Sequence, residues 1–437
     1  MSSTYLTRTP SSASDRKTWT WSAWVKRSSL STGNQVLFVA RDGGFPEKIQ
    51  FNSSDQLEYD HDIAGTDYTV RSDMLFRDTS AWYHIVVAKD TTQSTETNRL
   101  LFYANGQGLA TTEFQLGYPP QNYDGAINNT VIHTQGSDGT GYEYFDGSMS
   151  HINFVDGAAL TPSAFGETDA TTGEWKIKTS PSVTYGTNGF FILKDGNSVT
   201  DQSGEGNNFT VGGGTLTKTE DSPSNVFATW NPLVNNAGEM MRLTNGNTSC
   251  QSNAAEGNSW KLAVSTLGMT SGKYYWEAKL VNINNNNYHG VMGSNVFQAN
   301  ASLPMNATGF TGWNNSDGGE ILKDGDNTAN NYGTLADNDI LGIACDVDNY
   351  TISVYKNGSA LVSNYALSTT GRDILFPCSL AYNTNNTGIP QSSYNFGNGY
   401  FGTTAVASAG TNASGNGIFE YDVPTGFTAL STKGLNL

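Results

Sequence analysis

Apolar and polar residues alternate over short stretches along most of this chain of 437 residues. An amphipathic helix would place apolar residues at positions i, i+3, i+4 and i+7, and no convincing window of that kind is longer than about ten residues. The short stretches are rich in aromatic and β-branched side chains and end at Gly, Asn, Asp or Ser, which is typical of strands. The strands predicted in this way cover residues 19–25, 82–88, 100–103, 273–281 and 350–355.

Two of these stretches are followed by an Asn-Gly pair, Asn105-Gly106 and Asn357-Gly358. Such pairs readily adopt the positive φ angles that tight hairpin turns require. Many short strands, separated by turn signals about every 8–15 residues, indicate antiparallel sandwiches. The pattern therefore predicts an all-β protein built from antiparallel β-sandwiches.

The length favours two or three domains, each large enough to bury its own core. Residues 212–240 are polar and rich in turn formers, apart from an apolar segment at residues 227–233. We therefore predict a first domain over residues 1–232, a linker over 233–240 and a second domain over 241–437. Residues 165–230 are expected to supply strands that complete the first sandwich, and the apolar segment is expected to seal the joint between the domains.

Charge and hydropathy exclude several kinds of partner. The 23 Lys+Arg and 40 Asp+Glu give 23 − 40 = −17, and the Lys and Arg residues form no cluster. Phosphate backbones and anionic membrane surfaces would be repelled, which argues against nucleic acid as a partner. No apolar run has the roughly 18 residues of a membrane span, and the first 24 residues lack the apolar core of a secretory signal. We expect no membrane insertion, and a protein that is made in a cytoplasm and released by lysis.

The cysteines and histidines form no recognisable metal or redox motif. Three Cys residues are too few for a disulfide framework. Cys345 and Cys378 lie in register with apolar neighbours and are expected to be small core residues. The five His residues show no zinc spacing, and His84 and His151 fall inside strand patterns, where a structural role is expected. These observations predict no metal site of this kind and no Cys nucleophile.

Motifs in the first half resemble the laminin-G-like, concanavalin-A-like family of sandwiches. They follow one another in the order known from that family, and alternate residues in them are apolar, as expected for strands that face a second sheet. The motifs are residues 19–26 (WTWSAWVK), 80–88 (SAWYHIVVA), 101–106 (LFYANG) and 145–152 (FDGSMSHI), followed by Ala159-Leu160.

Motifs in the second half resemble the ordered signature of a SPRY domain, a compact bent β-sandwich used for binding. Six of them occur in the expected order. They are residues 272–277 (GKYYWE), 341–346 (LGIACD), 352–358 (ISVYKNG), 375–377 (LFP), 394–397 (YNFG) and 424–427 (PTGF).

The combination of the two domains, joined by residues 225–233 (NVFATWNPL), is similar to virion proteins of tailed phages. This resemblance implies a tail-fibre or capsid-appended protein that is located in the virion and contacts other virion proteins. It also implies a homo-oligomer, with a trimer expected by analogy, although the chain has no coiled-coil heptads to support one.

An enzymatic alternative rests on one strand of the first half. Glycoside hydrolases that share this fold carry two or three acidic residues on alternate positions of a strand, and the nearest run here is Glu58, Asp60 and Asp62. The second Glu of the hydrolase pattern is replaced by Asp, which is shorter by a methylene and would lie too far from the reacting carbon. We therefore predict a protein that is not an enzyme, with a glycoside hydrolase as the less favoured alternative.

Calcium is a second candidate, because laminin-G-like and lectin sandwiches often hold it with loop oxygens. Asp42, Asp124 and Asp138 lie in glycine-containing loops of the first half. None of these loops has the ordered spacing of a legible calcium site, so a structural Ca²⁺ in the N-terminal domain is left open as an alternative to ion-free acidic turns.

The resemblance to SPRY domains implies that loops at one end of the second sandwich bind the ligand. These loops are predicted at residues 282–289, 300–319, 323–331 and 382–391, and they combine Asn side chains with aromatic rings, a mixture that suits sugar hydroxyls and C–H surfaces. The predicted ligand-binding residues are Tyr288, His289, Trp313, Asn314, Asp317, Tyr382 and Asn385. An inward-packed Trp313 is an equal alternative.

The sequence thus predicts a non-enzymatic virion protein that binds host surface glycans. A purely structural module that docks onto other virion proteins is the alternative.

Overall fold

The computed structural model describes residues 3–30, 32–194, 196, 198–234, 240–252, 260–283, 287–294, 306–314, 318–327, 332–368, 373–382 and 389–436. The chain divides into two compact units, Met1–Lys218 and Thr219–Leu437. Secondary structure in the described residues consists of strands and of three-residue 3-10 helices, η1 (Glu96–Asn98), η2 (Pro162–Ala164) and η6 (Gly434–Asn436). Within this part of the chain, no helix has the length and apolar character that spanning a membrane requires.

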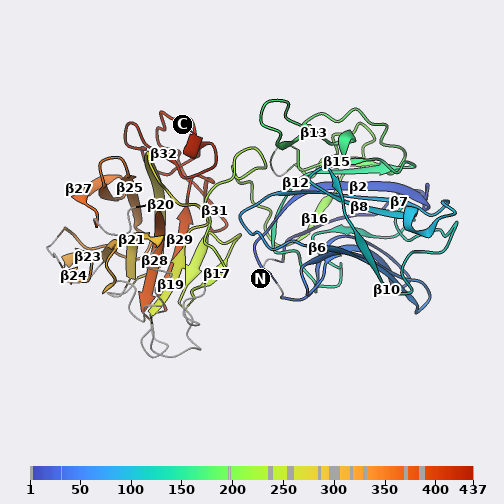
Figure 1. The fold of residues 1–437 in the computed structure, drawn as a ribbon, viewed down its shortest axis with the longest axis horizontal. Helices are drawn as coiled ribbons and strands as arrows, with labels where there is room; N and C mark the ends of the chain where they lie inside the picture. The colour runs from blue at the N-terminus through green and yellow to red at the C-terminus, as the bar shows by residue number, and fades with distance from the viewer. Residues whose placement is uncertain are drawn as a thin grey trace. The chain divides into compact units, whose positions relative to one another are not determined.

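The first unit is a sandwich of two antiparallel sheets, one with β2, β7 and β8 and the other with β6 and β10 (Figure 1). The eight-stranded sheet has the order β10 (Thr111–Gln115), β6 (Asp67–Leu75), β5 (Gln56–Asp62), β4 (Phe45–Phe51), β3 (Gln35–Asp42), β11 (His133–Gln135), β1 (Tyr5–Arg8) and β16 (Thr210–Gly213). The six-stranded sheet has the order β15 (Phe190–Ile192), β12 (Gly147–Asp156), β2 (Thr18–Arg27), β7 (Tyr83–Asp90), β8 (Leu100–Ala104) and β9 (Gln107–Gly108).

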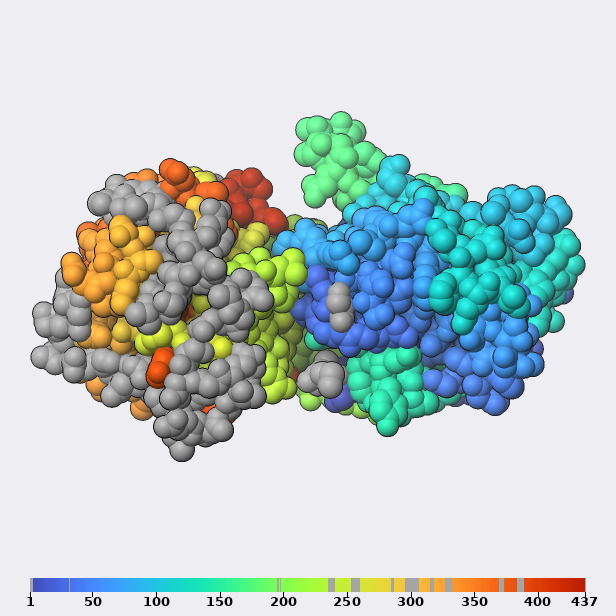
Figure 2. Space-filling model, turned by 60° about the horizontal axis from the view of Figure 1, so that its bottom comes forward, coloured from blue at the N-terminus to red at the C-terminus, as the bar shows by residue number. Residues whose placement is uncertain are grey.

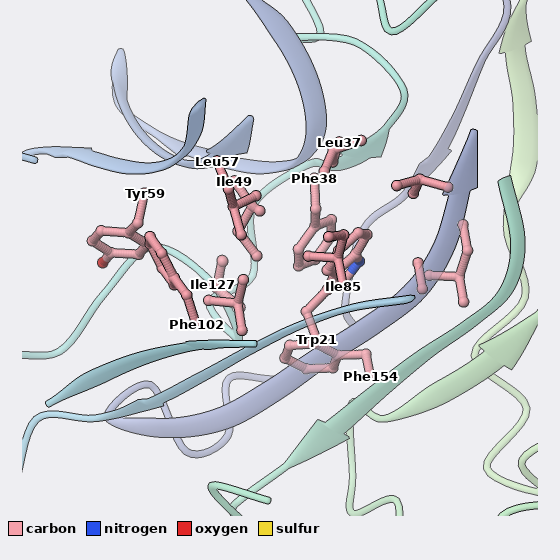
Figure 3. Close-up of a cluster of buried hydrophobic side chains, with 14 of the residues drawn as sticks. Trp21, Leu37, Phe38, Ile49, Leu57, Tyr59, Ile85, Phe102, Ile127 and Phe154 are labelled. Carbon is pink, nitrogen blue, oxygen red and sulfur yellow. The ribbon is translucent and has the colours of Figure 1, made fainter. Parts of the chain in front are cut away.

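The core of the first unit lies between these two sheets. Figure 3 shows Ile49 and Leu57 of the eight-stranded sheet pointing toward Trp21 and Ile85 of the six-stranded sheet. All four side chains are completely buried. Each large apolar side chain buried in this way contributes about 1.5–3 kcal/mol relative to exposure. In the alternating pattern that predicted the strands, the apolar positions therefore face the core and the polar positions face outward.

A hairpin of β13 (Gly166–Thr168) and β14 (Trp175–Ile177) forms a separate two-stranded sheet. Its Trp175 ring lies so close to Gly106 and Gly166 that a Cβ on either glycine would come within 2.5 Å of it. The green segment that includes this hairpin projects from the rest of the first unit in Figure 2. Residues 165–230 therefore do not all complete the sandwich as predicted, since only β15 and β16 join its two large sheets.

The second unit is also a sandwich of two antiparallel sheets (Figure 1). The eight-stranded sheet has the order β17 (Arg242–Thr244), β18 (Ser249–Gln251), β29 (Gln391–Asn395), β20 (Lys273–Asn282), β25 (Ile340–Asp346), β26 (Thr351–Lys356) and β27 (Ser359–Ala366), with β32 (Thr428–Ala429) parallel to β20. The six-stranded sheet has the order β19 (Trp260–Val264), β28 (Leu375–Tyr382), β21 (Asn287–Gly293), β22 (Phe310–Asn314), β23 (Glu320–Lys323) and β24 (Asp326–Asn327). β30 (Tyr400–Phe401) and β31 (Thr404–Ala405) form a small hairpin.

The boundary between the units lies earlier than the predicted residue 232. Phe227 and Trp230 are at most 1% exposed and pack in the core clusters of the second unit. The Trp230 ring contacts Tyr394 and Phe396 edge to face, with ring centroids 4.5 and 5.3 Å apart. The apolar segment is therefore part of the second core, although its sequence position suggested a seal between two domains.

The predicted fold class is confirmed: the protein is all-β, with two antiparallel β-sandwiches. The five predicted strands lie at β2, β7, β8, β20 and β26. Asn105 and Asn357 have the expected positive φ, both 47°, in the β8–β9 and β26–β27 turns. Cys345 and Cys378 are buried and unpaired with other cysteines, as predicted.

Candidate functional site

The outer face of the eight-stranded sheet in the first unit carries charged, amide and aromatic side chains next to one another. Leu57 and Tyr59 of β5 point into the core, so Glu58 and Asp60 point outward. Figure 2 views the first unit from the side of this sheet, and the mid-blue surface belongs to the region of β3 to β6. This face is the candidate site.

The register of the strands places complementary side chains beside one another. Glu58 lies opposite Arg71 of β6, and Asp60 lies opposite Lys48 of β4. Lys48 also reaches Glu143, in a segment that bonds to β3 through the backbone. We call the following residues the outer-face row: Phe114, Arg71, Glu58, Asp60, Lys48 and Glu143.

The cations of the outer-face row are neutralised within it. Arg71 Nε donates to Glu58 Oε2 at 2.5 Å, and its guanidinium lies 3.5 Å from the centre of the Phe114 ring. Lys48 Nζ lies 3.4 Å from a carboxylate oxygen of both Asp60 and Glu143. Burial raises the pKa of Asp60, while Lys48 opposes that rise. The result is a preorganised polar surface without an excess of positive charge.

One aromatic ring of this surface and one next to it in the chain are open to solvent. Phe114 is 44% exposed, and Tyr142, which precedes Glu143, is 73% exposed. Exposed aromatic rings beside fixed polar groups are suited to the C–H faces and hydroxyls of sugars.

The acidic run considered for hydrolysis is held in place by structural contacts. Glu58 is 4% exposed and accepts hydrogen bonds from Gln50 Nε2 at 2.6 Å and Asn52 Nδ2 at 3.1 Å, in addition to Arg71. Asp60 accepts from Thr69 Oγ1 at 2.9 Å, and Asp62 accepts from the backbone N–H of Gly65 at 2.7 Å. A nucleophile and an acid acting on one sugar need free approach to the reacting carbon, and these contacts occupy the carboxylates.

A serine and a histidine in the first unit lie close together but have the wrong tautomer for nucleophilic catalysis. Ser22 Oγ lies 2.9 Å from His84 Nε2, and Trp175 Nε1 donates to His84 Nδ1 at 3.0 Å. Because Nδ1 accepts a hydrogen bond from the indole N–H, the ring proton of the neutral imidazole is on Nε2, which donates a hydrogen bond to Ser22 Oγ. Burial lowers the pKa of His84 to about 3. This imidazole therefore cannot remove the serine proton, and the group stabilises the docked hairpin.

Four of the predicted ligand-binding residues lie in strands, where loops were expected. Tyr288 and His289 belong to β21, and Trp313 and Asn314 belong to β22. Their exposed fractions are 8%, 1%, 1% and 1%, respectively. Trp313 thus takes the inward-packed alternative, because β22 continues to Asn314 and its inner face lines the core.

The other three predicted ligand-binding residues lie at or beyond the limits of the described chain. Tyr382 ends β28, is half-buried and packs on Trp260, with ring centroids 5.2 Å apart. Asp317 and Asn385 lie outside the described residues. The structure places His289 beside Trp313 on the core side of the six-stranded sheet and Tyr288 beside Asn314 on its other side. None of these four residues is exposed at the surface.

The acidic loops considered for calcium are occupied by protein groups. Asp42 accepts from Asn129 Nδ2 at 2.6 Å, and Asp124 lies 3.9 Å from Lys17. Asp138 accepts from the backbone N–H groups of Thr140 and Tyr142 and pairs with Arg41 at 3.1 Å. Among the described residues, no group of three or more His, Cys, Asp or Glu residues is arranged to hold a metal ion.

Sequence reasoning did not identify Arg71, Phe114 or Lys48 as site residues. A signal was present in residues 111–115 (TTEFQ), where a single Phe stands in an otherwise polar stretch. An isolated aromatic in a polar strand points away from a core. Its pairing with Arg71 depends on the register of β10 against β6, which the sequence pattern does not specify.

Comparisons with known proteins support the assignment of the first half. The family model Laminin_G_3, described as the concanavalin A-like lectin/glucanases superfamily, matches residues 1–165. No curated protein matches the chain.

Solved structures that match the chain include domains LG4-5 of the mouse laminin alpha1 chain, with 10% identity, a TM-score of 0.29 and coverage of 86% of this chain and 79% of that one. The heptameric SAP-like pentraxin from Limulus polyphemus has 19% identity, a TM-score of 0.27 and coverage of 37% and 72%. The SPRY domain of human HERC1 has 16% identity, a TM-score of 0.26 and coverage of 34% and 87%. Likenesses at these scores support no statement about function.

Proposed function

We propose that this chain is a non-enzymatic adhesion protein of a phage virion, and that it binds glycans on the host surface through the outer-face row of the first unit. The observation that carries the proposal is the open face on which Phe114 stands beside fixed polar groups, with the exposed Tyr142 next to Glu143 in the chain. The concanavalin-A-like match over residues 1–165 supports a lectin-like role for the same unit. The virion context rests on the domain pairing seen in the sequence.

The charges on this face favour a neutral glycan over an acidic one. Three cations, Arg41, Lys48 and Arg71, are bonded to four carboxylates, those of Asp138, Asp60, Glu143 and Glu58. No positive charge remains in excess, and the chain as a whole carries a net charge of −17. A sialic or uronic acid would therefore meet repulsion, whereas a neutral sugar would not.

Retention of the full-length protein on glycan arrays and on host-type cells, before and after periodate oxidation, tests the proposal. We expect periodate-sensitive retention on neutral glycans and about a tenfold loss of affinity in Phe114→Ala and in Tyr142→Ala, the equivalent of one aromatic contact. Phe45→Ala is the matched control, because Phe45 is 41% exposed and lies outside the outer-face row.

Three results would contradict this proposal. Retention that survives in Phe114→Ala and Tyr142→Ala would place the glycan elsewhere on the chain. Absence of retention on every array and cell type, together with tight binding to one virion protein, would establish the docking module. Release of reducing ends from β-glucans, lost in Glu58→Gln, would instead establish a hydrolase.

A further inference from the structure

Three buried polar side chains meet on the inner face of the six-stranded sheet in the second unit. His289 of β21 lies directly opposite Trp313 of β22. Asn287 precedes His289 by two residues on the same strand and therefore faces the same side. The exposed fractions of Asn287, His289 and Trp313 are 2%, 1% and 1%.

A contact across the sandwich shows that this side faces the core. His289 Nδ1 lies 2.5 Å from the hydroxyl of Tyr394, which belongs to β29 of the opposite sheet. Trp313 packs with Val291 and Tyr394 in the core cluster between the sheets. Directly opposite residues of an antiparallel pair have Cβ atoms about 4.5–5.5 Å apart, and diagonal neighbours are about 7–8 Å apart. The three side chains thus start from neighbouring positions on one face of the sheet.

One atom of each side chain lacks a hydrogen-bond partner among the described residues. These atoms are Asn287 Oδ1, His289 Nε2 and Trp313 Nε1. Buried polar atoms in folded proteins are bonded to protein or to ordered water in the great majority of cases. Three such atoms on adjacent, register-paired positions therefore point to a shared bonding partner.

The chemistry of the three atoms selects the kind of partner. Trp313 Nε1 can only donate, and Asn287 Oδ1 can only accept. His289 Nε2 donates if the Tyr394 hydroxyl donates to Nδ1, and it accepts if Nδ1 carries the proton. An anion cannot bond to the acceptor and a metal ion cannot bond to the indole donor, whereas a water molecule both donates and accepts and fits either histidine tautomer.

We propose that Asn287, His289 and Trp313 form an internal site that binds one water molecule between the sheets of the second unit. Three protein partners are the usual number for a buried water. Through His289 and Tyr394, this water links β21 and β22 of one sheet to β29 of the other. The site is independent of the proposed glycan surface, which lies on the first unit.

Nuclear magnetic resonance of the full-length protein with ¹⁵N-labelled tryptophan tests the proposal directly. We expect a cross-relaxation peak between bound water and the indole N–H of Trp313, which bulk water cannot reach. The indole of Trp230 is the internal control. It is also buried, and its Nε1 has no partner among the described residues. Its ring, however, stands edge to face with Tyr394 and Phe396. Absence of a peak at Trp313, or equal peaks at Trp313 and Trp230, would overturn the proposal.

Substitutions provide a second measurement. A site that holds a water molecule and a site that holds none differ in how far each substitution lowers the midpoint of thermal unfolding. Trp313→Phe and Trp230→Phe remove the same ring atoms from completely packed positions. If water bonds to Trp313, its substitution also breaks that bond, and the midpoint of thermal unfolding of the second unit falls further than in Trp230→Phe. If the site is dry, Trp313→Phe removes an unpaired buried donor and the midpoint falls no further than in the control. Binding of glycans to the first unit is unchanged in both variants.

Discussion

Glu47 of the first unit and Glu277 of the second are both completely buried, yet their carboxylates have opposite environments. Glu47 Oε1 accepts from Lys89 Nζ at 2.6 Å, and Lys89 is itself completely buried. Tyr59 donates to the same oxygen at 2.8 Å, and the backbone N–H of Ile127 donates to Oε2 at 2.7 Å. The charge of this carboxylate is therefore matched by a cation and fixed by two further donors.

Glu277 is held by neutral donors instead. The backbone N–H groups of Glu420 and Tyr421 donate to Oε2 and Oε1, each at 2.9 Å. Tyr275 and Asn395 contribute weaker side-chain bonds at 3.2 and 3.3 Å. These contacts attach the segment around Glu420 to β20, but no lysine or arginine among the described residues forms an ion pair with this carboxylate.

The difference between the two sites appears in their pKa values. Burial raises the pKa of each carboxyl, but for Glu47 the combined effect of Lys89, His61 and the hydrogen bonds prevails and lowers the pKa to about 2. For Glu277 burial prevails over the four donors, and the pKa rises to about 7. A buried carboxylate is thus kept ionised by a partner charge, whereas neutral hydrogen bonds alone do not compensate for its loss of hydration.

The largest expected effect comes from removal of the cation beside Glu47. Lys89→Met retains the length of the side chain but leaves a buried carboxylate without its partner, so we expect the first unit to lose about 3–5 kcal/mol of unfolding free energy. Urea denaturation, followed by hydrogen exchange of peptides that contain Ile127, measures this loss. The double variant Glu47→Gln/Lys89→Met is the control and should recover most of it, because no charge stays buried.

The pH dependence that Glu47 adds to the stability of the first unit should differ in sign from the one that Glu277 adds to the stability of the second. The lowered pKa of Glu47 contributes stability that is present above its unfolded value of 4.5 and is lost as the pH falls toward 2. The raised pKa of Glu277 contributes stability that is present below 4.5 and is lost as the pH rises through 7, by about 3 kcal/mol at most. Hydrogen exchange at Ile127 and at Tyr421, corrected for the intrinsic rate at each pH, reports the units separately. Subtracting the profiles of Glu47→Gln and Glu277→Gln removes the contributions of the buried histidines, whose pKa values burial lowers. Differences of equal sign would contradict the assignment.

A smaller effect is expected for Glu277→Gln. Both carboxylate oxygens accept a backbone N–H, so an amide in either orientation turns its NH₂ group toward one of these donors. We expect a loss of about 1–2 kcal/mol at pH 5, the effect of one broken buried hydrogen bond. The part of the pH dependence that Glu277 contributes between 4.5 and 7 should be absent from this variant. The opposite contribution of His289, whose pKa burial lowers to about 3, should remain. Equal slopes in Glu277→Gln and in the parent would assign the titration to another group.

The strands and hairpin turns were predictable from the sequence because alternation and Asn-Gly pairs act locally. The domain boundary was not predictable in this way. The apolar character of Trp230 indicates that the residue is buried, but it does not indicate which of the two cores contains it. The prediction of loops was wrong at Tyr288 and Trp313 for a related reason. Asn-rich neighbours suggested loops, whereas β21, which contains Tyr288, pairs with β28 and with β22, which contains Trp313.

The candidate site depends on contacts between residues that are distant in sequence. Arg71 meets Glu58 across 13 positions, and Lys48 meets Glu143 across 95. Such pairs follow from strand order and register, which local patterns do not contain. The same limit applies to Glu47 and Lys89, which are 42 residues apart and looked like ordinary solvated charges in the sequence.

The smallest expected effect concerns a lysine whose ion pairs are exposed, in contrast to the buried pair of Lys89. Lys176 lies 3.1 Å from Asp169 and 3.5 Å from Glu167 on the β13–β14 hairpin, but its side chain is 48% exposed. Water already solvates these charges, so Lys176→Met should leave the midpoint of thermal unfolding unchanged in calorimetry. Trp175→Ala on the same hairpin is the control and should lower the midpoint, because its ring packs on Gly106 and bonds to His84. If Lys176→Met lowered stability as much as Lys89→Met, the loss of stability would depend on the proximity of the opposite charges and not on their burial.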